Sequence, residues 1–234
     1  MIKEKVNKLI NKNNIESEKI KYDSAIHRFF VFFWIFWIGS FIGVIVETLW
    51  CIFKNGKIES RTALIFENLN PIYGIGALLL TLFLYKFKDK NIIIVFLISA
   101  VVGGLFETLC SIIQEFVFGT VSWYYGEDSF GILGGRTSII YCVYWGFLGI
   151  IWIKSIYPFA SNKLKSIKIN VLRPLTYLVI TIFIFDVVIS CLAVYRQNER
   201  RNNIEAKTFI GRYFDKNYDD EKLKKIYPNM FVMW

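Results

Sequence analysis

The sequence predicts an all-α, polytopic membrane protein with about five transmembrane helices, and three observations support this prediction. The 234 residues are 55% hydrophobic with a mean hydropathy of +0.43, which is more apolar than a typical soluble domain. The apolar residues form long runs separated by short charged stretches, as the bilayer requires. Two of the runs also share a motif, so that helices 1–2 and 3–4 are predicted to form a parallel repeat.

Five apolar runs reach or approach the roughly 20 residues needed to cross the hydrocarbon core. The second run is the weakest, because Glu67 and Pro71 lie inside it. Its first part could be a loop or half-helix that dips in from the surface, which is tolerated only where protein or water lines it. The predicted transmembrane domain is 29–195, with helices at about 29–53, 62–87, 92–118, 137–157 and 175–195.

The segments on either side of this domain are polar. Residues 1–28 hold seven Lys/Arg and four acids, and they form either a cytoplasmic membrane-surface helix or a solvated tail. They lack a short apolar core followed by a small-residue cleavage site, so we expect no cleavable signal peptide. The C-terminal tail, 196–234, holds nine Lys/Arg and six acids and is predicted to be a polar tail.

The distribution of positive charge predicts the orientation. With a cytoplasmic N-terminus, the inner segments hold fifteen Lys/Arg and the two outer loops hold four, in agreement with the positive-inside rule. Five crossings then place the basic C-terminal tail outside, which the rule disfavours. The first helix, however, usually dominates the orientation of the whole protein. We predict a multi-pass protein of the cell (plasma) membrane. The net charge is +9, and the positively charged residues flank the apolar runs. Lipid headgroups rather than nucleic acid are therefore the expected partner.

A motif in the first run recurs 60 residues later in the third. The string Gly-x-x-x-Gly-x-x-x-Glu-Thr-Leu at 39–49 aligns with Ser-x-x-x-Gly-x-x-x-Glu-Thr-Leu at 99–109. A spacing of four places the small residues and the acid on one helical face. Arg-Thr at 61–62 precedes the second run, and Arg-Thr at 136–137 opens the fourth. Both units run in the same direction, so the predicted repeat axis is the membrane normal.

The charged residues of this repeat form the main candidate site. A carboxylate in the hydrocarbon region costs ~2.5–3.5 kcal/mol, so it must face the bundle interior or find a partner. We expect Glu47 and Glu107 near the shared axis, with Arg61 and Arg136 above them and Glu115 extending the polar line outward. Two interpretations remain open: structural ion pairs that fix helix register, or a substrate or ion site in the outer half of the membrane.

Two further features bear on function. Asp186, midway along the fifth run, is either another member of the polar site or forms a packing hydrogen bond to a hydroxyl. The outer loop 123–135, rich in aromatic residues and glycine, suits either a compact lid over a cavity or an aromatic belt with turns. His27 is the only histidine, and no catalytic set or metal cluster is visible, so we expect no enzyme, metal or cofactor.

Several short motifs follow one another along the chain: Gly43-x-x-x-Glu47, Asn70-Pro71-Ile72-Tyr73-Gly74, Glu107, Glu115-x-x-Phe118-Gly119, Trp123-x-Tyr125, Gly135-Arg136, Asp186-x-x-x-Ser190 and Ile226-Tyr227-Pro228-Asn229-Met230. From about residue 30 to 231 this series resembles a family of bacterial membrane proteins, the putative ABC-transporter type IV or CmpB-like putative permeases. The sequence departs from the family at Tyr124, where an Asp is expected.

The resemblance implies a permease-like component for a small solute or ion. Five helices are few for a secondary transporter, so a homo-oligomer or a partner transporter subunit is expected. No ATP-binding motif occurs, and the longest inner loop, 154–173, is shorter than a site for docking an ATPase should be. The alternative is a non-transporting regulator or interaction protein whose C-terminal tail is the interaction surface. A third class, an intramembrane enzyme acting on lipid, would need an acid pair accessible from the side.

Overall fold

The computed structural model describes the backbone of residues 2–126 and 130–232 and the side chains from Ser24 onward. The fold is mostly helical, with a 3₁₀ turn Tyr85–Phe87 after α2, a π-helical turn Trp152–Ile156 between α4 and α5, and a small antiparallel hairpin of β1 (Gly131–Ile132) and β2 (Thr137–Ser138) before α4. The helices are α1 Ile2–Asn55, α2 Pro71–Leu84, α3 Ile92–Phe118, α4 Ile139–Ile151, α5 Tyr157–Ser166, α6 Ile169–Arg201, α7 Phe209–Asn217 and α8 Asp220–Ile226.

Within the described residues, four helical stretches are long and apolar enough to cross a membrane. Their outward surfaces carry large exposed apolar side chains, such as Leu105 on α3 and Phe185 on α6. Helices with such surfaces fit an all-α membrane protein, because a helix satisfies its own backbone polar groups in lipid. The four stretches are Ser24–Asn55, Ile92–Phe118, Ile139–Ser166 and Ile169–Arg201.

The second predicted span, 62–87, is helical only in its second part. α2 starts at Pro71, a favoured first helical residue, and the Asn70 side chain caps it by accepting the N–H of Ile72 at 3.1 Å. Even with its 3₁₀ turn, this helix is too short at ~1.5 Å per residue to cross a core of ~30 Å. Residues 62–70 form a non-helical loop. A fifth complete crossing therefore remains a prediction.

The helices pack as two pairs, α1 with α2 and α3 with α4. Small residues permit both close approaches: a methyl group added to Gly43 or Gly103 would overlap the aromatic ring that faces it. Three contacts recur, with partners 60 residues apart on α1 and α3 and 72 apart on α2 and α4: Gly43–Tyr73 with Gly103–Trp145, Phe36–Gly74 with Phe96–Gly146, and Gly39–Ala77 with Ser99–Gly149.

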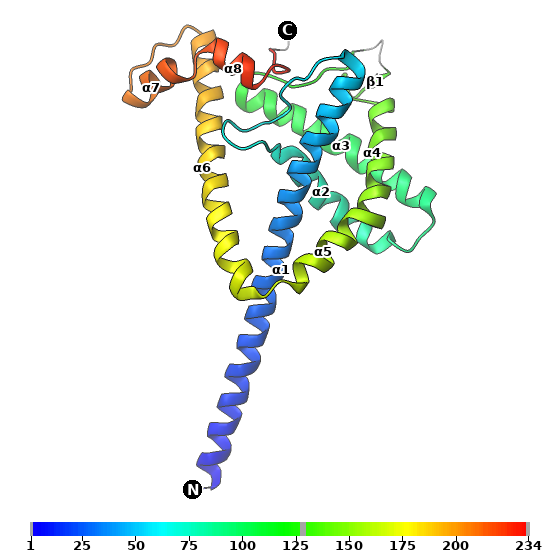
Figure 1. Ribbon diagram of the computed structural model, residues 1–234, viewed down its shortest axis with the longest axis vertical. Coiled ribbons are helices and arrows are strands. Elements are labelled where there is room, and N and C mark those ends of the chain that lie inside the picture. Colours follow the sequence, from blue (N-terminus) through cyan, green and yellow to red (C-terminus); the bar gives the residue numbers. More distant parts are fainter. Residues whose placement is uncertain (1, 127–129, 233–234) are drawn as a thin grey trace.

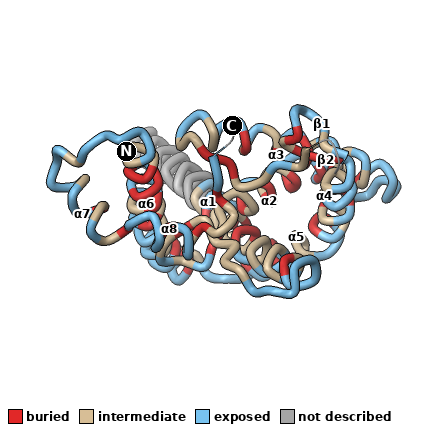
Figure 2. The backbone as a smooth tube through the Cα atoms, turned by 90° about the horizontal axis from the view of Figure 1, so that it is seen from above, coloured by how far each residue is buried: buried red, intermediate tan, exposed pale blue. Residues whose placement is uncertain are grey.

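The views from the side and from above show α1 in the middle of the molecule (Figures 1 and 2). α6 lies on one side of α1, α4 lies on the other, and the two chain termini lie at opposite ends of the long axis. Toward the N-terminal end, a buried apolar cluster joins five α-helices and the π-helical turn, through residues such as Phe30, Leu84, Val95, Leu164 and Leu172. This cluster holds the two helix pairs together at that end.

The C-terminal tail folds into a compact cap at the other end. α6 continues to Arg201, and the chain then turns back so that Phe214 of α7 and Leu223 of α8 belong to one buried cluster with Val194 of α6. The end of the chain reaches the segment after α3, where Val121 and Phe231 form an antiparallel bridge. The segment predicted as a polar tail is thus a packed part of the fold.

Ion pairs hold this cap to α6. Both oxygens of Asp215 on α7 accept hydrogen bonds from Arg196, each at 2.9 Å, and Arg200 reaches Asp215 at 2.8 Å. The bidentate geometry is the strong form of an arginine–carboxylate pair. The Arg196 guanidinium, through these hydrogen bonds, holds the pKa of the Asp215 carboxyl below its ordinary value.

Replacing Gly103 by valine tests the close packing of α3 on α4. The added side chain would overlap Trp145, and we expect a loss of ~1–3 kcal/mol, seen as a lower thermal unfolding midpoint of the protein in detergent. The matched control is Val101→Ile on the same helix, because Val101 is 61% exposed and has room for one methylene. Equal midpoints for the two variants would show that the glycine contact does not matter.

The Asp215 pair predicts how the cap responds to acid. Because the folded pKa is depressed, the pair stabilises the fold above the unfolded pKa of ~3.9, and this contribution is lost as the pH falls through the lower folded value. We expect Asp215→Asn to lower the unfolding midpoint at pH 6, with the difference from the unchanged protein shrinking below about pH 4. Glu205→Gln, at an exposed position of the same tail, is the control. A difference that does not shrink at all as the pH falls below about 4 would contradict the assignment.

Candidate functional site

Glu47 and Tyr73 form the first half of the candidate site, on α1 and α2. The Tyr73 hydroxyl donates a hydrogen bond to Glu47. Arg61, in the segment that connects these helices, places its Nη1 3.8 Å from a Glu47 carboxylate oxygen. The ring of Tyr73 is positioned by its close contact with Gly43, one turn before Glu47. The Glu47 side chain remains 27% exposed.

Glu107 of α3 forms the second half of the site. It accepts hydrogen bonds from the Tyr125 hydroxyl and the Thr137 hydroxyl, each at 2.6 Å, and it is 9% exposed. Tyr125 lies in the loop after α3, and Thr137 lies in β2 just before α4. Each glutamate therefore receives a tyrosine hydroxyl from a segment that follows its own helix.

The two glutamates belong to one cluster. They lie close enough to interact electrostatically, and the Tyr73 hydroxyl interacts with both. The rings of Tyr125 and Tyr141 lie 4.3 Å apart between centroids and cover the Glu107 side of the group. We call this group the outer carboxylate cluster, after the orientation that the sequence predicts; its members are Glu47, Arg61, Tyr73, Glu107, Tyr125, Thr137 and Tyr141.

Arg61 and Arg136 differ in whether they contact the glutamate of the repeated motif in their own unit. Arg61 contacts Glu47 at 3.8 Å, as the sequence predicts. Arg136 forms its ion pair with Glu115, two turns beyond Glu107 on α3. In the part of the chain that the structure describes, Glu107 has no ion-pair partner. The polar line from Glu107 to Glu115 exists, but its cation pairs with Glu115, near the C-terminal end of α3.

This arrangement fits a site for positive charge. A buried carboxylate without a cation is costly, and two hydroxyl donors compensate only part of the lost hydration. A proton on the carboxyl, or a cation bound beside it, would remove the remaining cost. The hydroxyls of Tyr73, Tyr125 and Thr137 also supply oxygen atoms that could contact a bound cation. Groups of His, Cys, Asp and Glu that could hold a metal ion are not found among the described residues.

Asp186 lies outside this cluster and anchors the loop 62–70. It is 1% exposed on α6 and accepts the backbone N–H groups of residues 65–67 at 2.7–3.1 Å, together with the Ser190 hydroxyl at 3.0 Å. Three consecutive N–H groups that converge on one carboxylate form an anion-binding concavity. The cyan segment in Figure 1 runs from the top of α1 across to α6, where this contact is made. Of the two roles predicted for Asp186, the hydrogen bond with a hydroxyl is present, from Ser190, and the hydrogen bonds of Asp186 within the described residues do not include Glu47 or Glu107.

The loop 123–135, which the sequence predicts to be an outer loop, positions Tyr125 against Glu107. The backbone N–H of Tyr125 bonds the carbonyl of Gly135 at 2.8 Å, and Trp123 donates its indole N–H to the Arg136 carbonyl at 2.9 Å. The turn uses a left-handed backbone at Gly135, with φ of 73°. Residues 127–129, within the predicted lid, lie outside the described residues. The part that is described forms a compact turn at the cluster.

The hydroxyl groups that donate to the two glutamates were not predicted from the sequence. Tyr73 and Tyr125 both occur in the ordered series of motifs, and Thr137 follows Arg136 in the repeated Arg-Thr pair. These motifs are the features of the sequence that could have indicated the donors. The donors come from segments far from their acceptors in sequence, as for Thr137 and Glu107, which are 30 residues apart. Only the packing of the helix pairs brings such residues together.

A comparison with known families places these residues in a wider group. The model of the family described as "Putative ABC-transporter type IV" matches residues 34–191, more than half of the chain. The matched region includes the whole outer carboxylate cluster and Asp186. No curated protein and no solved structure matches the chain significantly.

Removing the Asp186 carboxylate tests the anchoring of the loop. Asp186→Ala leaves the N–H groups of residues 65–67 without their carboxylate acceptor, at a cost of ~1–3 kcal/mol for each buried group left unsatisfied. We expect faster hydrogen exchange at these amides and a lower unfolding midpoint. Ser190→Ala, which removes only one of the acceptors of Ile65, should have a smaller effect. Unchanged exchange at residues 65–67 in the Asp186 variant would refute the anchor.

Proposed function

The chain belongs to the putative ABC-transporter type IV family, and from this premise we propose that it is a permease-like membrane component for a small solute or ion. One observation carries the proposal. Glu107 is almost fully buried, is held by two hydroxyls, lies near Glu47 and has no ion-pair partner among the described residues. Intramembrane carboxylates of this kind are characteristic of ion and proton pathways.

The chemistry of the cluster favours positive charge in the substrate. Three hydroxyls donate to the two carboxylates. The single cluster arginine, Arg61, contacts Glu47 at 3.8 Å and not Glu107, and it also pairs with Glu59 outside the cluster at 3.0 Å. A proton, an inorganic cation or a small solute with an ammonium group suits this set of acceptors. An anion would be repelled by Glu107.

The site lies between two units that we propose to be a parallel repeat, α1–α2 and α3–α4. The shared register of three interhelical contacts supports this proposal, as do the two glutamates 60 residues apart. The positive charge near the N-terminal end argues for a cytoplasmic N-terminus in a bacterial cell membrane. The outer carboxylate cluster would then face the outer half of the bilayer.

The proposed role is non-enzymatic and includes partners. We propose that the protein works with a further transporter subunit or as a homo-oligomer, because one such bundle is small for a complete transporter. Co-purification of an ATP-hydrolysing subunit would give direct support to the transporter role. Its absence together with a cation current from the pure protein would instead favour an ATP-independent pathway.

The folded cap supports a second candidate function, a non-transporting regulator or interaction protein. Phe209, Ile210 and Tyr213 of α7 are exposed large apolar residues on the cap, next to exposed basic side chains. Deleting 205–234 is not a clean test, because it would uncover Val194 of α6. The substitution Ile210→Ser is a more specific test. Loss of cellular function in this variant, with normal function in Glu107→Gln, would favour the regulator or interaction protein over the transporter.

Substitution of the glutamates tests the transport proposal. The purified protein is reconstituted in liposomes, and capacitive currents are recorded on jumps of Na⁺, K⁺, methylammonium or, as the anionic probe, acetate. We expect a current with at least one cation, and we expect Glu107→Gln to reduce it by at least about tenfold, since a charged hydrogen-bond partner is worth ~1.5–3 kcal/mol. Glu47→Gln should also reduce it.

Glu205→Gln in the exposed tail is the matched control and should retain the full current. Membrane insertion and expression of all variants are compared by gel filtration in detergent. Full current in both Glu47→Gln and Glu107→Gln would show that the site is wrong. A current carried only by acetate would show that the charge of the substrate is wrong.

A further inference from the structure

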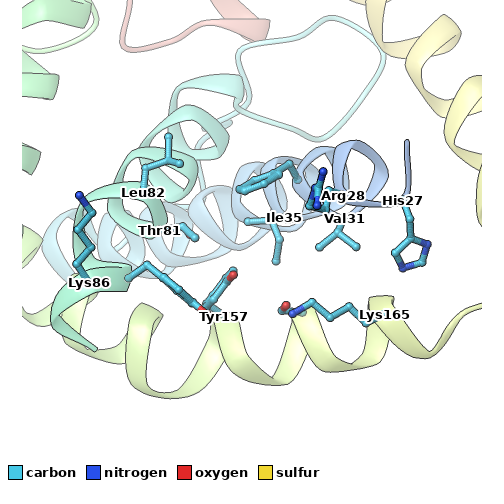
Figure 3. A pocket seen from close by; sticks show the side chains of 12 residues that line it. His27, Arg28, Val31, Ile35, Thr81, Leu82, Lys86, Tyr157 and Lys165 are labelled. Carbon is cyan, nitrogen blue, oxygen red and sulfur yellow. The ribbon is translucent and has the colours of Figure 1, made fainter. Parts of the chain in front are cut away.

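A separate cavity of about 330 Å³ lies at the N-terminal end of the bundle, between α1, α2 and α5 (Figure 3). Its volume is within the usual range for small-molecule sites. Arg28 at its rim and Glu47 of the outer carboxylate cluster lie on the same helix, about 28 Å apart at 1.5 Å per residue. The cavity is therefore not part of that cluster, and its role is independent of the proposed transport function.

The rim of the cavity is basic. His27 and Arg28 of α1, Lys86 beyond α2 and Lys165 of α5 line it, and the three cationic side chains of Arg28, Lys86 and Lys165 are exposed. Figure 3 shows Lys86 and Lys165 at opposite ends of the opening, with Tyr157 between them. None of the described residues that line the cavity is acidic.

The interior of the cavity is mostly apolar. Val31 and Ile35 are buried at its floor, while Phe32 and Leu82 line it from surfaces that are exposed. The buried hydroxyl of Thr81 is already used: it donates to the Ala77 carbonyl and accepts from the Trp152 indole, both at 2.8 Å. Apart from the hydroxyl of Ser161, the floor therefore offers hydrocarbon contact rather than a polar network.

We propose that this cavity binds an anionic phospholipid from the leaflet on the N-terminal side. The phosphate and headgroup would lie among Arg28, Lys86 and Lys165, and the start of an acyl chain would lie along Val31, Phe32 and Leu82. Basic pockets between transmembrane helices on the cytoplasmic side bind anionic headgroups in this way. Tyr85 and Tyr157 meet edge to face at the rim, with centroids 6.1 Å apart, as aromatic residues do at headgroup level.

The combination of rim and floor distinguishes a lipid from a free phosphate ion. Inorganic phosphate would satisfy the cations but leave the apolar wall of Val31 and Ile35 without a partner. A zwitterionic lipid such as phosphatidylcholine would contact the apolar wall, but its positive choline group would lie near the basic rim. Only an anionic amphiphile matches both surfaces of the cavity.

Native mass spectrometry of the full chain in detergent tests the proposal. Phosphatidylglycerol, phosphatidylcholine and sodium phosphate are titrated separately, and the bound fraction gives an apparent Kd for each. We expect phosphatidylglycerol to bind most tightly. The double substitution Lys86→Gln and Lys165→Gln should weaken it about 30-fold, which corresponds to ~1 kcal/mol for each cation near an anionic headgroup.

The matched control is Lys163→Gln with Lys168→Gln, two exposed lysines of the same region that do not line the cavity. Equal weakening by the control pair would overturn the site. Phosphatidylcholine or inorganic phosphate binding as tightly as phosphatidylglycerol would overturn the anionic lipid as occupant. If the Lys86 and Lys165 variant does not fold, the comparison of the three ligands on the unchanged protein decides the proposal.

Discussion

The path of the segment between α1 and α2 depends on one contact, the acceptance of three consecutive backbone N–H groups by Asp186. Lipid offers no hydrogen-bond partners, so an irregular segment at membrane depth is possible only where protein satisfies its backbone. Asp186 does this for residues 65–67, at 2.7–3.1 Å. The hydrogen bonds offset part of the cost of burying the carboxylate and the amides, whereas a buried carboxylate or amide without a partner would be expensive. α6 is thereby joined to the α1–α2 unit.

The contact also explains why the two helix pairs differ. In the second pair, Glu107 is reached by the loop hydroxyl of Tyr125 and by Thr137 at the start of α4. In the first pair the corresponding chain segment is drawn toward α6, and Tyr73 of the shortened α2 supplies the hydroxyl to Glu47. The interhelical contacts share one register, while the connecting segments follow different routes. Any symmetry of the outer carboxylate cluster is therefore approximate.

Much of this could be predicted from residue patterns, and the rest could not for physical reasons. The run 92–118 coincides with α3, because unbroken hydropathy is a local property. The break at Asn70-Pro71 correctly indicates where α2 begins. The partner of Asp186 could not be predicted, because backbone amides carry no sequence signal. The pairing of Arg136 with Glu115 depends on how a loop folds, and the cap depends on contacts such as Val121 with Phe231.

The distance along the chain between the loop and its acceptor has a consequence for biosynthesis. Ile65 and Asp186 are separated by 121 residues. At ~5–20 residues per second, a ribosome needs roughly 6 to 24 s to make that stretch. During this interval the loop has no carboxylate to bind, so its amides must stay hydrated at the membrane surface or be held by insertion machinery. The loop 62–70 can therefore form its final hydrogen bonds only after α6 has been synthesised.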